Sequence, residues 1–136
     1  MPGIGITEEL RSRTKRFAIS IIKFADDLPK TTASRVIQRQ IIRSATSLAA
    51  NYRAACRSRS RVEFIAKLGT VVEEADETMF WLDLLSEIGG SNNQAIAPLF
   101  QEATELLAIF STSRRTAKDK IKVCRHHQIT RSPDSA

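Results

Sequence analysis

Apolar residues recur at three- and four-residue spacing in four stretches of this chain, which is the pattern of amphipathic α-helices. We therefore expect helices over residues 7–28, 34–57, 61–88 and 94–120. The apolar sides of the four helices are, in chain order, Leu10, Phe17, Ile21, Phe24 and Leu28; Ile37, Ile41, Ala45, Leu48, Tyr52 and Ala55; Ile65, Leu68, Val72, Ala75, Met79 and Leu82; and Leu99, Ala103, Leu106, Phe110 and Ala117.

Signals that begin and end the first two helices lie at the edges of these stretches. Thr7 is a suitable N-cap for the first helix, because its hydroxyl can accept a hydrogen bond from an end amide. Pro29 ends that helix, since a proline disfavours helical backbone at the residue before it. Either Thr32 or Ser34 can cap the second helix, and the sequence leaves both open.

The boundaries of the last two helices carry more specific signals. Ser60 and Glu63 have the spacing of a capping box, which predicts the start of the third helix. The glycine- and asparagine-rich segment 89–93 separates the third helix from the fourth, and Pro98 suits the first turn of the fourth. Four helices joined by short loops favour an all-α, antiparallel up-down-up-down four-helix bundle over residues 1–122. Residues 123–136 form a basic tail that we expect to be disordered.

The third helix carries more apolar surface than one antiparallel neighbour can cover. We interpret the excess either as a central position in the bundle or as burial between subunits. The candidate oligomer-interface residues are Phe64, Val71, Phe80, Trp81 and Leu85.

Composition narrows the class of protein. The 136 residues correspond to one domain, and 42% hydrophobic content with 26% charge is typical of an ordered globular protein. No apolar run approaches the roughly 20 residues of a membrane-spanning helix, and the N-terminus lacks the apolar segment of a signal peptide. The two cysteines do not make a disulfide framework. We therefore expect a cytoplasmic protein with no membrane contact.

The net charge of +6 hides a segregation along the chain. Residues 1–57 hold 11 basic and 4 acidic residues, residues 58–110 hold 3 and 9, and residues 111–136 hold 7 and 2. A basic first half and an acidic middle can pair within a bundle or between subunits. The positive surplus also favours a polyanion such as RNA or DNA.

Five arginines of the second helix lie within an arc of roughly 80° at about 100° per residue, on the side opposite its apolar seam. They are Arg35, Arg39, Arg43, Arg53 and Arg57. Guanidinium groups on one face repel one another unless anions meet them. One interpretation is pairing with carboxylates of a neighbouring helix or subunit, among Glu73, Glu74, Asp76, Glu77, Asp83 and Glu87; the other is a phosphate-binding surface.

Catalytic and metal-binding interpretations find little support in the residue pattern. Ser44, Ser47 and Asn51 lie beside the apolar seam of the second helix with no base nearby in sequence, so we interpret them as packing residues. Residues 124–127 contain one Cys and two His, which is fewer than the four ligands of a structural zinc site. Trp81, at helical spacing, is interpreted as a packing residue rather than a base-stacking platform. We expect no metal and no cofactor.

The central motif resembles a known family. It comprises Arg43-Ser-Ala-Thr-Ser47, Asn51, Ser60, Glu63-Phe64, Glu74-Ala75, Glu77-Thr78 and Trp81-Leu82. This pattern is similar to that of the four-helix-bundle proteins encoded in intervening sequences of bacterial large-subunit ribosomal RNA, and to that of the accessory proteins of diversity-generating retroelements. The resemblance continues through Ser111–Lys118 and covers about residues 10 to 120.

The resemblance implies an antiparallel four-helix bundle that assembles into a homopentamer, a ring with a central channel. It also implies no catalytic site, and the retroelement relatives bind nucleic acid and a reverse transcriptase through a basic surface. This chain departs from the pattern at Ala54, where many relatives carry glutamate. It also has extra arginines at Arg53, Arg57, Arg59 and Arg61.

These observations lead us to expect a non-enzymatic homo-oligomer that binds RNA or DNA. The resemblance alone implies a reverse transcriptase as a further partner. Binding should not be sequence-specific. The expected nucleic-acid-binding residues are Arg35, Arg39, Arg43, Arg53, Arg57, Arg59, Arg61, Arg114, Arg115 and Lys118. The alternative is a purely structural scaffold whose arginines pair with acidic residues across subunit interfaces.

Overall fold

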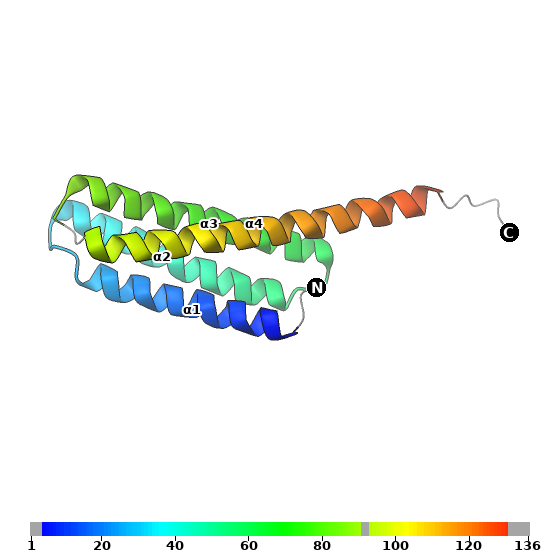
Figure 1. The fold of residues 1–136 in the computed structure, drawn as a ribbon, viewed down its shortest axis with the longest axis horizontal. Helices are drawn as coiled ribbons and strands as arrows, with labels where there is room; N and C mark the ends of the chain where they lie inside the picture. The colour runs from blue at the N-terminus through cyan, green and yellow to red at the C-terminus, as the bar shows by residue number, and fades with distance from the viewer. Residues whose placement is uncertain (1–3, 91–92, 131–136) are drawn as a thin grey trace.

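The computed structural model describes residues 4–90 and 93–130, and their regular structure is entirely helical (Figure 1). The four helices are α1 (Ile4–Asp26), α2 (Thr32–Cys56), α3 (Arg61–Ile88) and α4 (Asn93–Thr130). Their number and order confirm the predicted four-helix bundle. No helix in these ranges is both long enough and apolar enough to cross a bilayer.

The helices run alternately up and down, and consecutive helices pack side by side (Figure 1). α1 packs mainly on α2 and touches α4 only sparingly, so the ring of helices is loosest between α1 and α4. The predicted apolar seams meet in one core. Its largest fully buried apolar side chains are Ile21, Ile41, Leu48, Leu68, Val71, Leu82, Leu85, Leu106 and Phe110. Removing each of these from water stabilises the fold by roughly 1.5–3 kcal/mol.

The N-terminal caps of the first two helices differ from those predicted. Thr7 lies inside α1, where its side chain bonds to the Tyr52 hydroxyl instead of capping an end amide. The cap of α2 is Thr31, whose Oγ1 accepts a hydrogen bond from the Ser34 amide at 3.1 Å. Thr32 is the first residue of α2, and Ser34 is buried. Several hydroxyl residues in succession can each serve as a cap, and packing decides which one does.

The predicted break between α3 and α4 is confirmed, as is the predicted cap of α3. α1 ends at Asp26, two residues before the predicted end, and Pro98 lies inside α4 beyond its first turn, because α4 already begins at Asn93. The Ser60 hydroxyl accepts from the Glu63 amide at 3.1 Å, and the Glu63 carboxylate accepts from the Arg59 amide at 3.2 Å. Ser60 is therefore the N-cap of α3 as predicted, while the Glu63 carboxylate bonds to the amide one residue before the cap instead of to the Ser60 amide. Gly89 and Gly90, which follow α3, have φ angles of 76° and 79°, a region that side chains larger than hydrogen disfavour.

The last helix is longer than predicted. α4 continues to Thr130 and extends past the other three helices (Figure 1). The expected disorder is therefore wrong for residues 123–130, while residues 131–136 lie outside the described ranges. After Pro98 no further proline or glycine interrupts α4, and its lysines, arginines and glutamines have good helix propensity, so the helix propagates without bundle contacts.

A buried hydroxyl pair joins α2 to α3. Ser44 Oγ and Thr78 Oγ1 are 2.8 Å apart, and both side chains are fully buried. Each hydroxyl also lies within hydrogen-bonding distance of a carbonyl of its own helix, at Ile41 and Glu74. Small residues next to the pair, Ala45 and Ala75, are fully buried and allow the two helix backbones to approach closely.

A charged cluster joins α1 to α4, where apolar contact is sparse. Arg13 donates to both carboxylate oxygens of Glu102, at 3.0 and 2.6 Å, and to Glu105 at 2.8 Å. These charge-assisted bonds lower the pKa of the Glu102 carboxyl below its ordinary value, and partial burial opposes the shift only in part.

The hydroxyl pair is tested by a double-mutant cycle. Ser44→Ala and Thr78→Val should each lower the free energy of unfolding by about 1 kcal/mol, because each removes one buried hydrogen bond. The double variant should lose less than the sum, since the shared bond is removed only once. Urea denaturation measures all three values. Thr46→Val is the control, because its hydroxyl bonds only within α2, and its effect should add to that of Ser44→Ala. Additivity between Ser44 and Thr78 would contradict the assignment.

The Arg13–Glu102 pair predicts a pH dependence. Because the folded-state pKa of Glu102 is depressed, its stabilisation is present above the unfolded value, near 4.5, and is lost as the pH falls through the lower folded value. At neutral pH the free energy of unfolding of the wild type should exceed that of Glu102→Gln by up to about 1 kcal/mol. Urea unfolding at successive pH values should show this difference shrinking below pH 4.5. Glu87→Gln, an exposed change on α3, should show no such trend.

Candidate nucleic-acid interface

The antiparallel fold sorts charge toward opposite ends of the bundle. The half that contains the α2–α3 loop, here called the basic end, comprises residues 7–16, 45–71 and 110–123 and holds 14 basic and 4 acidic residues. The other half, the acidic end, comprises residues 17–44 and 72–109 and holds 5 basic and 10 acidic residues. The bundle is therefore a strong electrostatic dipole along its axis.

A groove between α1 and α2 lies on the basic end. We call it the α1–α2 groove, and its volume is about 560 Å³. Two alanines, Ala49 and Ala50, leave room for a ligand to approach the α2 backbone. The remaining lining residues are Arg11, Ser12, Lys15, Arg53 and Arg57. Arg11 forms an ion pair with Glu8, whereas Lys15, Arg53 and Arg57 are exposed and form none within the described residues.

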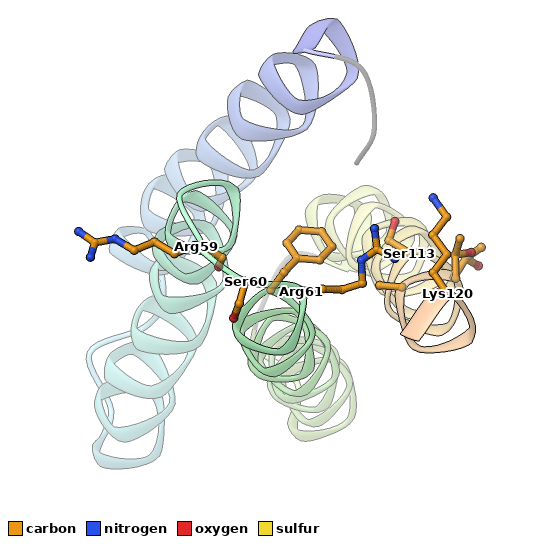
Figure 2. Close-up of a pocket in the computed structure, with 10 residues that line it drawn as sticks. Arg59, Ser60, Arg61, Ser113 and Lys120 are labelled. Carbon is orange, nitrogen blue, oxygen red and sulfur yellow. The ribbon is translucent and has the colours of Figure 1, made fainter. Parts of the chain in front are cut away.

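A second hollow, the α3–α4 recess, also lies on the basic end and has a volume of about 520 Å³. Its lining residues are Ser58, Arg59, Ser60, Arg61, Phe64, Thr112, Ser113, Thr116, Ala117 and Lys120. Figure 2 shows Arg61 reaching from the start of α3 toward α4, where Ser113 and Lys120 lie. The Arg59 guanidinium points away from the recess in the same view. No Asp or Glu is among the lining residues.

The predicted nucleic-acid-binding residues fall into three groups. Six of them are exposed on the basic end and form no ion pair in the described ranges, namely Arg53, Arg57, Arg59, Arg61, Arg115 and Lys118. Arg35 and Arg39 are exposed as well, but they lie on the acidic end. Arg43 and Arg114 are engaged within the bundle. The predicted continuous stripe along the second helix is thus divided between the two ends.

Arg43 is exposed but is paired with carboxylates of the same chain. Its guanidinium bonds to the Glu74 carboxylate at 3.2 Å and also pairs with Glu77. Both acids belong to α3, so the pairing alternative holds for this arginine. Arg43 and Glu77 directly precede Ser44 and Thr78 in sequence, so the ion pair and the hydroxyl pair join adjacent positions of α2 and α3.

Arg114 is half-buried against α3 rather than projecting into water. Its Nε donates to the Ile65 carbonyl at 3.4 Å, and its guanidinium lies over Gly69. A Cβ at Gly69 would come within 3.1 Å of Arg114 Nε. A glycine in the middle of α3 lowers the stability of the helix by about 1 kcal/mol. The close approach of the Arg114 side chain explains why position 69 is a glycine. Arg114 is therefore less available to an external phosphate than predicted.

Lys15 and Lys120 belong to the basic end but were missed by the sequence reasoning. Each lies on a helix whose charges gave no stripe, α1 and α4 respectively. The available signal was the four-residue spacing of Arg11 and Lys15, which places both on one helix face. Their proximity to Arg53 and Arg57 depends on packing between helices, which periodicity does not reveal.

Two predicted interface residues are wrong. Val71 and Leu85 are 0% exposed in the core of the single chain, so they cannot contact another subunit. The wide apolar face of α3 thus reflects its position between α2 and α4. Phe80 is 55% exposed and meets the half-buried Trp81 edge to face at a centroid distance of 4.9 Å. The Trp81 Nε1 is buried without a hydrogen-bond partner in the described chain, so packing holds the indole.

The Tyr52 hydroxyl and the Cys56 thiol lie close together among packed side chains. Tyr52 is buried against Phe110 at a ring-centroid distance of 4.8 Å, and burial raises the pKa of its hydroxyl, with a further contribution from Cys56. Cys56 is half-buried and is not in a disulfide.

The side chains of residues 124–127 lie outside the described part of the structure. Among the described residues no three Cys, His, Asp or Glu side chains gather as metal ligands would.

Comparison with known proteins identifies relatives of this bundle. The sequence profile of the 23S rRNA-intervening sequence protein family matches residues 8–112, which is most of the chain. The chain is also similar to a solved structure of a protein of unknown function from the S23 ribosomal protein family of Bacteroides thetaiotaomicron, with 28% sequence identity and a TM-score of 0.74. That match covers 80% of this chain and 97% of the other. No functionally curated protein matches the chain.

The contact between Arg114 and Gly69 is tested by substitution in two backgrounds. Gly69→Ala gains about 1 kcal/mol of helix propensity, but the new methyl group displaces the Arg114 guanidinium, so its net effect on the free energy of unfolding should stay within about 0.5 kcal/mol. In an Arg114→Ala background the same substitution should stabilise by about 1 kcal/mol. Thermal or urea unfolding measures both. An equal effect in the two backgrounds would show that the contact does not constrain this position.

Proposed function

The chain belongs to the 23S rRNA-intervening sequence protein family, and we propose that it is a cytoplasmic, non-catalytic, oligomeric four-helix bundle that binds RNA or DNA through phosphate contacts without reading sequence. The observation that carries this proposal is the excess of basic over acidic residues at one end of the bundle. Six predicted binding residues at that end are exposed and have no ion pair within the described chain.

The α1–α2 groove suits a phosphate backbone. Its alanine floor allows phosphates to approach the helix closely, while Lys15, Arg53 and Arg57 supply cations on both walls. Each lysine or arginine that neutralises a phosphate releases condensed counterions, so affinity should depend steeply on salt. Phosphate contacts of this kind position a nucleic acid but carry no sequence information.

The partners follow from chemistry and family. The family is named after an intervening sequence of 23S rRNA, which makes RNA the first nucleic acid to test. A reverse transcriptase is a further proposed partner, and it rests only on the resemblance to retroelement accessory proteins. The serine of α2 with the most buried hydroxyl, Ser44, bonds to Thr78 inside the core, which supports packing rather than nucleophilic chemistry.

The scaffold alternative also has a specific observation in its favour. Opposite charge at the two ends allows the basic end of one subunit to contact the acidic end of another, and Phe80 offers an exposed aromatic side chain on α3. A homo-oligomer, with the pentamer as the state expected from the family resemblance, is part of both proposals. They differ in whether the basic end remains open to nucleic acid after assembly.

Two matched triple variants test where binding occurs. Lys15→Gln/Arg53→Gln/Arg57→Gln removes three charges from the basic end, and Lys23→Gln/Arg35→Gln/Arg39→Gln removes three exposed charges from the acidic end. Binding of a fluorescent RNA duplex is followed by anisotropy across a salt series. The first variant should bind about tenfold or more weakly and lower the salt slope by about one for each phosphate that it no longer neutralises. The second should bind nearly as wild type does.

Solution mass, measured by light scattering, separates the two proposals. If the basic end binds nucleic acid, the first variant keeps the wild-type mass and loses affinity. If the arginines hold subunits together, the same substitutions lower the mass of the free protein. Salt-independent binding, or an equal loss in both variants, would refute the proposed location.

A further inference from the structure

We infer that the α3–α4 recess is a pocket for one unpaired nucleotide, which would be gripped by its phosphate and stacked by its base. This inference rests on the proposed function and deepens it, because it assigns to the basic end a second mode of binding beyond backbone attraction. The α1–α2 groove and the recess lie between different helix pairs of the same basic end. A strand whose backbone follows the basic end can therefore place one base in the recess.

The size and charge of the recess suit a nucleotide. Its volume of about 520 Å³ is within the roughly 300–1,000 Å³ of small-molecule sites. Arg61 spans from α3 toward α4, and Lys120 lies on the α4 side (Figure 2). Both side chains are exposed, and neither forms an ion pair within the described ranges. With no carboxylate in the lining, an anion here meets only positive charge.

Hydroxyl groups around the recess provide both donors and acceptors. Thr112 and Thr116 are exposed and make no side-chain hydrogen bond within the described part of the chain, so each can donate to a ligand. Ser58, in the α2–α3 loop, donates to the Ala54 carbonyl of α2, and Ser113 donates to the Ile109 carbonyl of its own helix, which leaves both hydroxyl oxygens free to accept. A sugar hydroxyl or the edge of a base requires this mixture, whereas an inorganic phosphate does not use the acceptors.

Phe64 supplies the apolar surface that distinguishes a nucleotide from a simple anion, and the inference assigns it this role in place of the oligomer-interface role expected from the sequence. It is the single aromatic residue among those that line the recess, and its ring is half-buried because one side packs on the core. Every base has a π-face, so stacking on an aromatic ring is strong but tolerant of sequence. The bases of an intact duplex are already stacked on each other and cannot reach the ring without being flipped out.

The inference predicts a preference for single strands that depends on the recess. Anisotropy titrations compare a short single-stranded RNA with an RNA hairpin that has the same number of phosphates. Wild type should bind the single strand more tightly than the hairpin, although the two RNAs have the same number of phosphates. Phe64→Leu keeps apolar volume but removes the aromatic face, and it should reduce this preference roughly tenfold. Hairpin affinity should change little.

Two further variants keep the test valid if Phe64→Leu folds poorly. Arg61→Gln changes an exposed side chain of the recess, and Arg115→Gln makes the same change on α4 outside the lining. Both remove one charge, so backbone binding should weaken equally. The ratio of single-strand to hairpin affinity should fall only in Arg61→Gln. Thermal unfolding confirms that each variant is folded.

Competition identifies the source of the nucleotide. Adenosine 5′-monophosphate, adenosine and inorganic phosphate are titrated against bound single strand. Competition by the monophosphate alone shows that a free nucleotide also enters the recess. No competition, together with a Phe64-dependent preference, shows that the nucleotide must belong to a strand. Either result supports the inference.

The contrary outcomes are distinct from failure of the proposed function. If inorganic phosphate competes as well as the monophosphate, the recess is only an anion site and the inference is overturned. An unchanged single-strand preference in both Phe64→Leu and Arg61→Gln also overturns it, while salt-dependent hairpin binding still supports the proposed function. If neither RNA binds, both proposals fall.

Discussion

The close approach of α2 and α3 is the constraint on which the rest of this bundle depends. Ser44 and Thr78 can bond across the interface only because Ala45 and Ala75 let the helix backbones come together. A register shift between the helices would leave two hydroxyls buried without this bond and would separate Arg43 from Glu74. The central motif of this chain therefore has a physical meaning: it fixes how two neighbouring helices are aligned.

That alignment determines the surface chemistry. With α2 and α3 in antiparallel register, the end of α2 and the start of α3 bring their arginines to one end, while six of the seven carboxylates of α3 lie at the other. Like charges crowded at the basic end repel one another and lower the stability of the free fold. An anion bound there relieves this repulsion, so a surface that is unfavourable for the isolated chain becomes favourable in a complex.

Some features of the candidate site could be predicted from local sequence. The capping pair of Ser60 and Glu63, the glycine turn at Gly89 and the exposure of Arg53 and Arg57 depend on residues within a few positions of one another, and the structure confirms them. The pairing of Arg43 and the burial of Val71 could not be decided in this way. Arg43 faces carboxylates more than thirty positions further along the chain, and Val71 is covered by helices on both sides of α3.

Four amphipathic helices, their order and the surplus of positive charge can all be predicted from the sequence, because periodicity and composition are local properties of the chain. Which arginines remain open, where the fourth helix leaves the bundle, and the separation of charge end to end instead of face to face all depend on helix packing. Helix packing also places Phe64, Arg61 and Lys120 around one recess. These outcomes depend on which helix faces lie against each other, and that is settled by the close packing of side chains from distant segments.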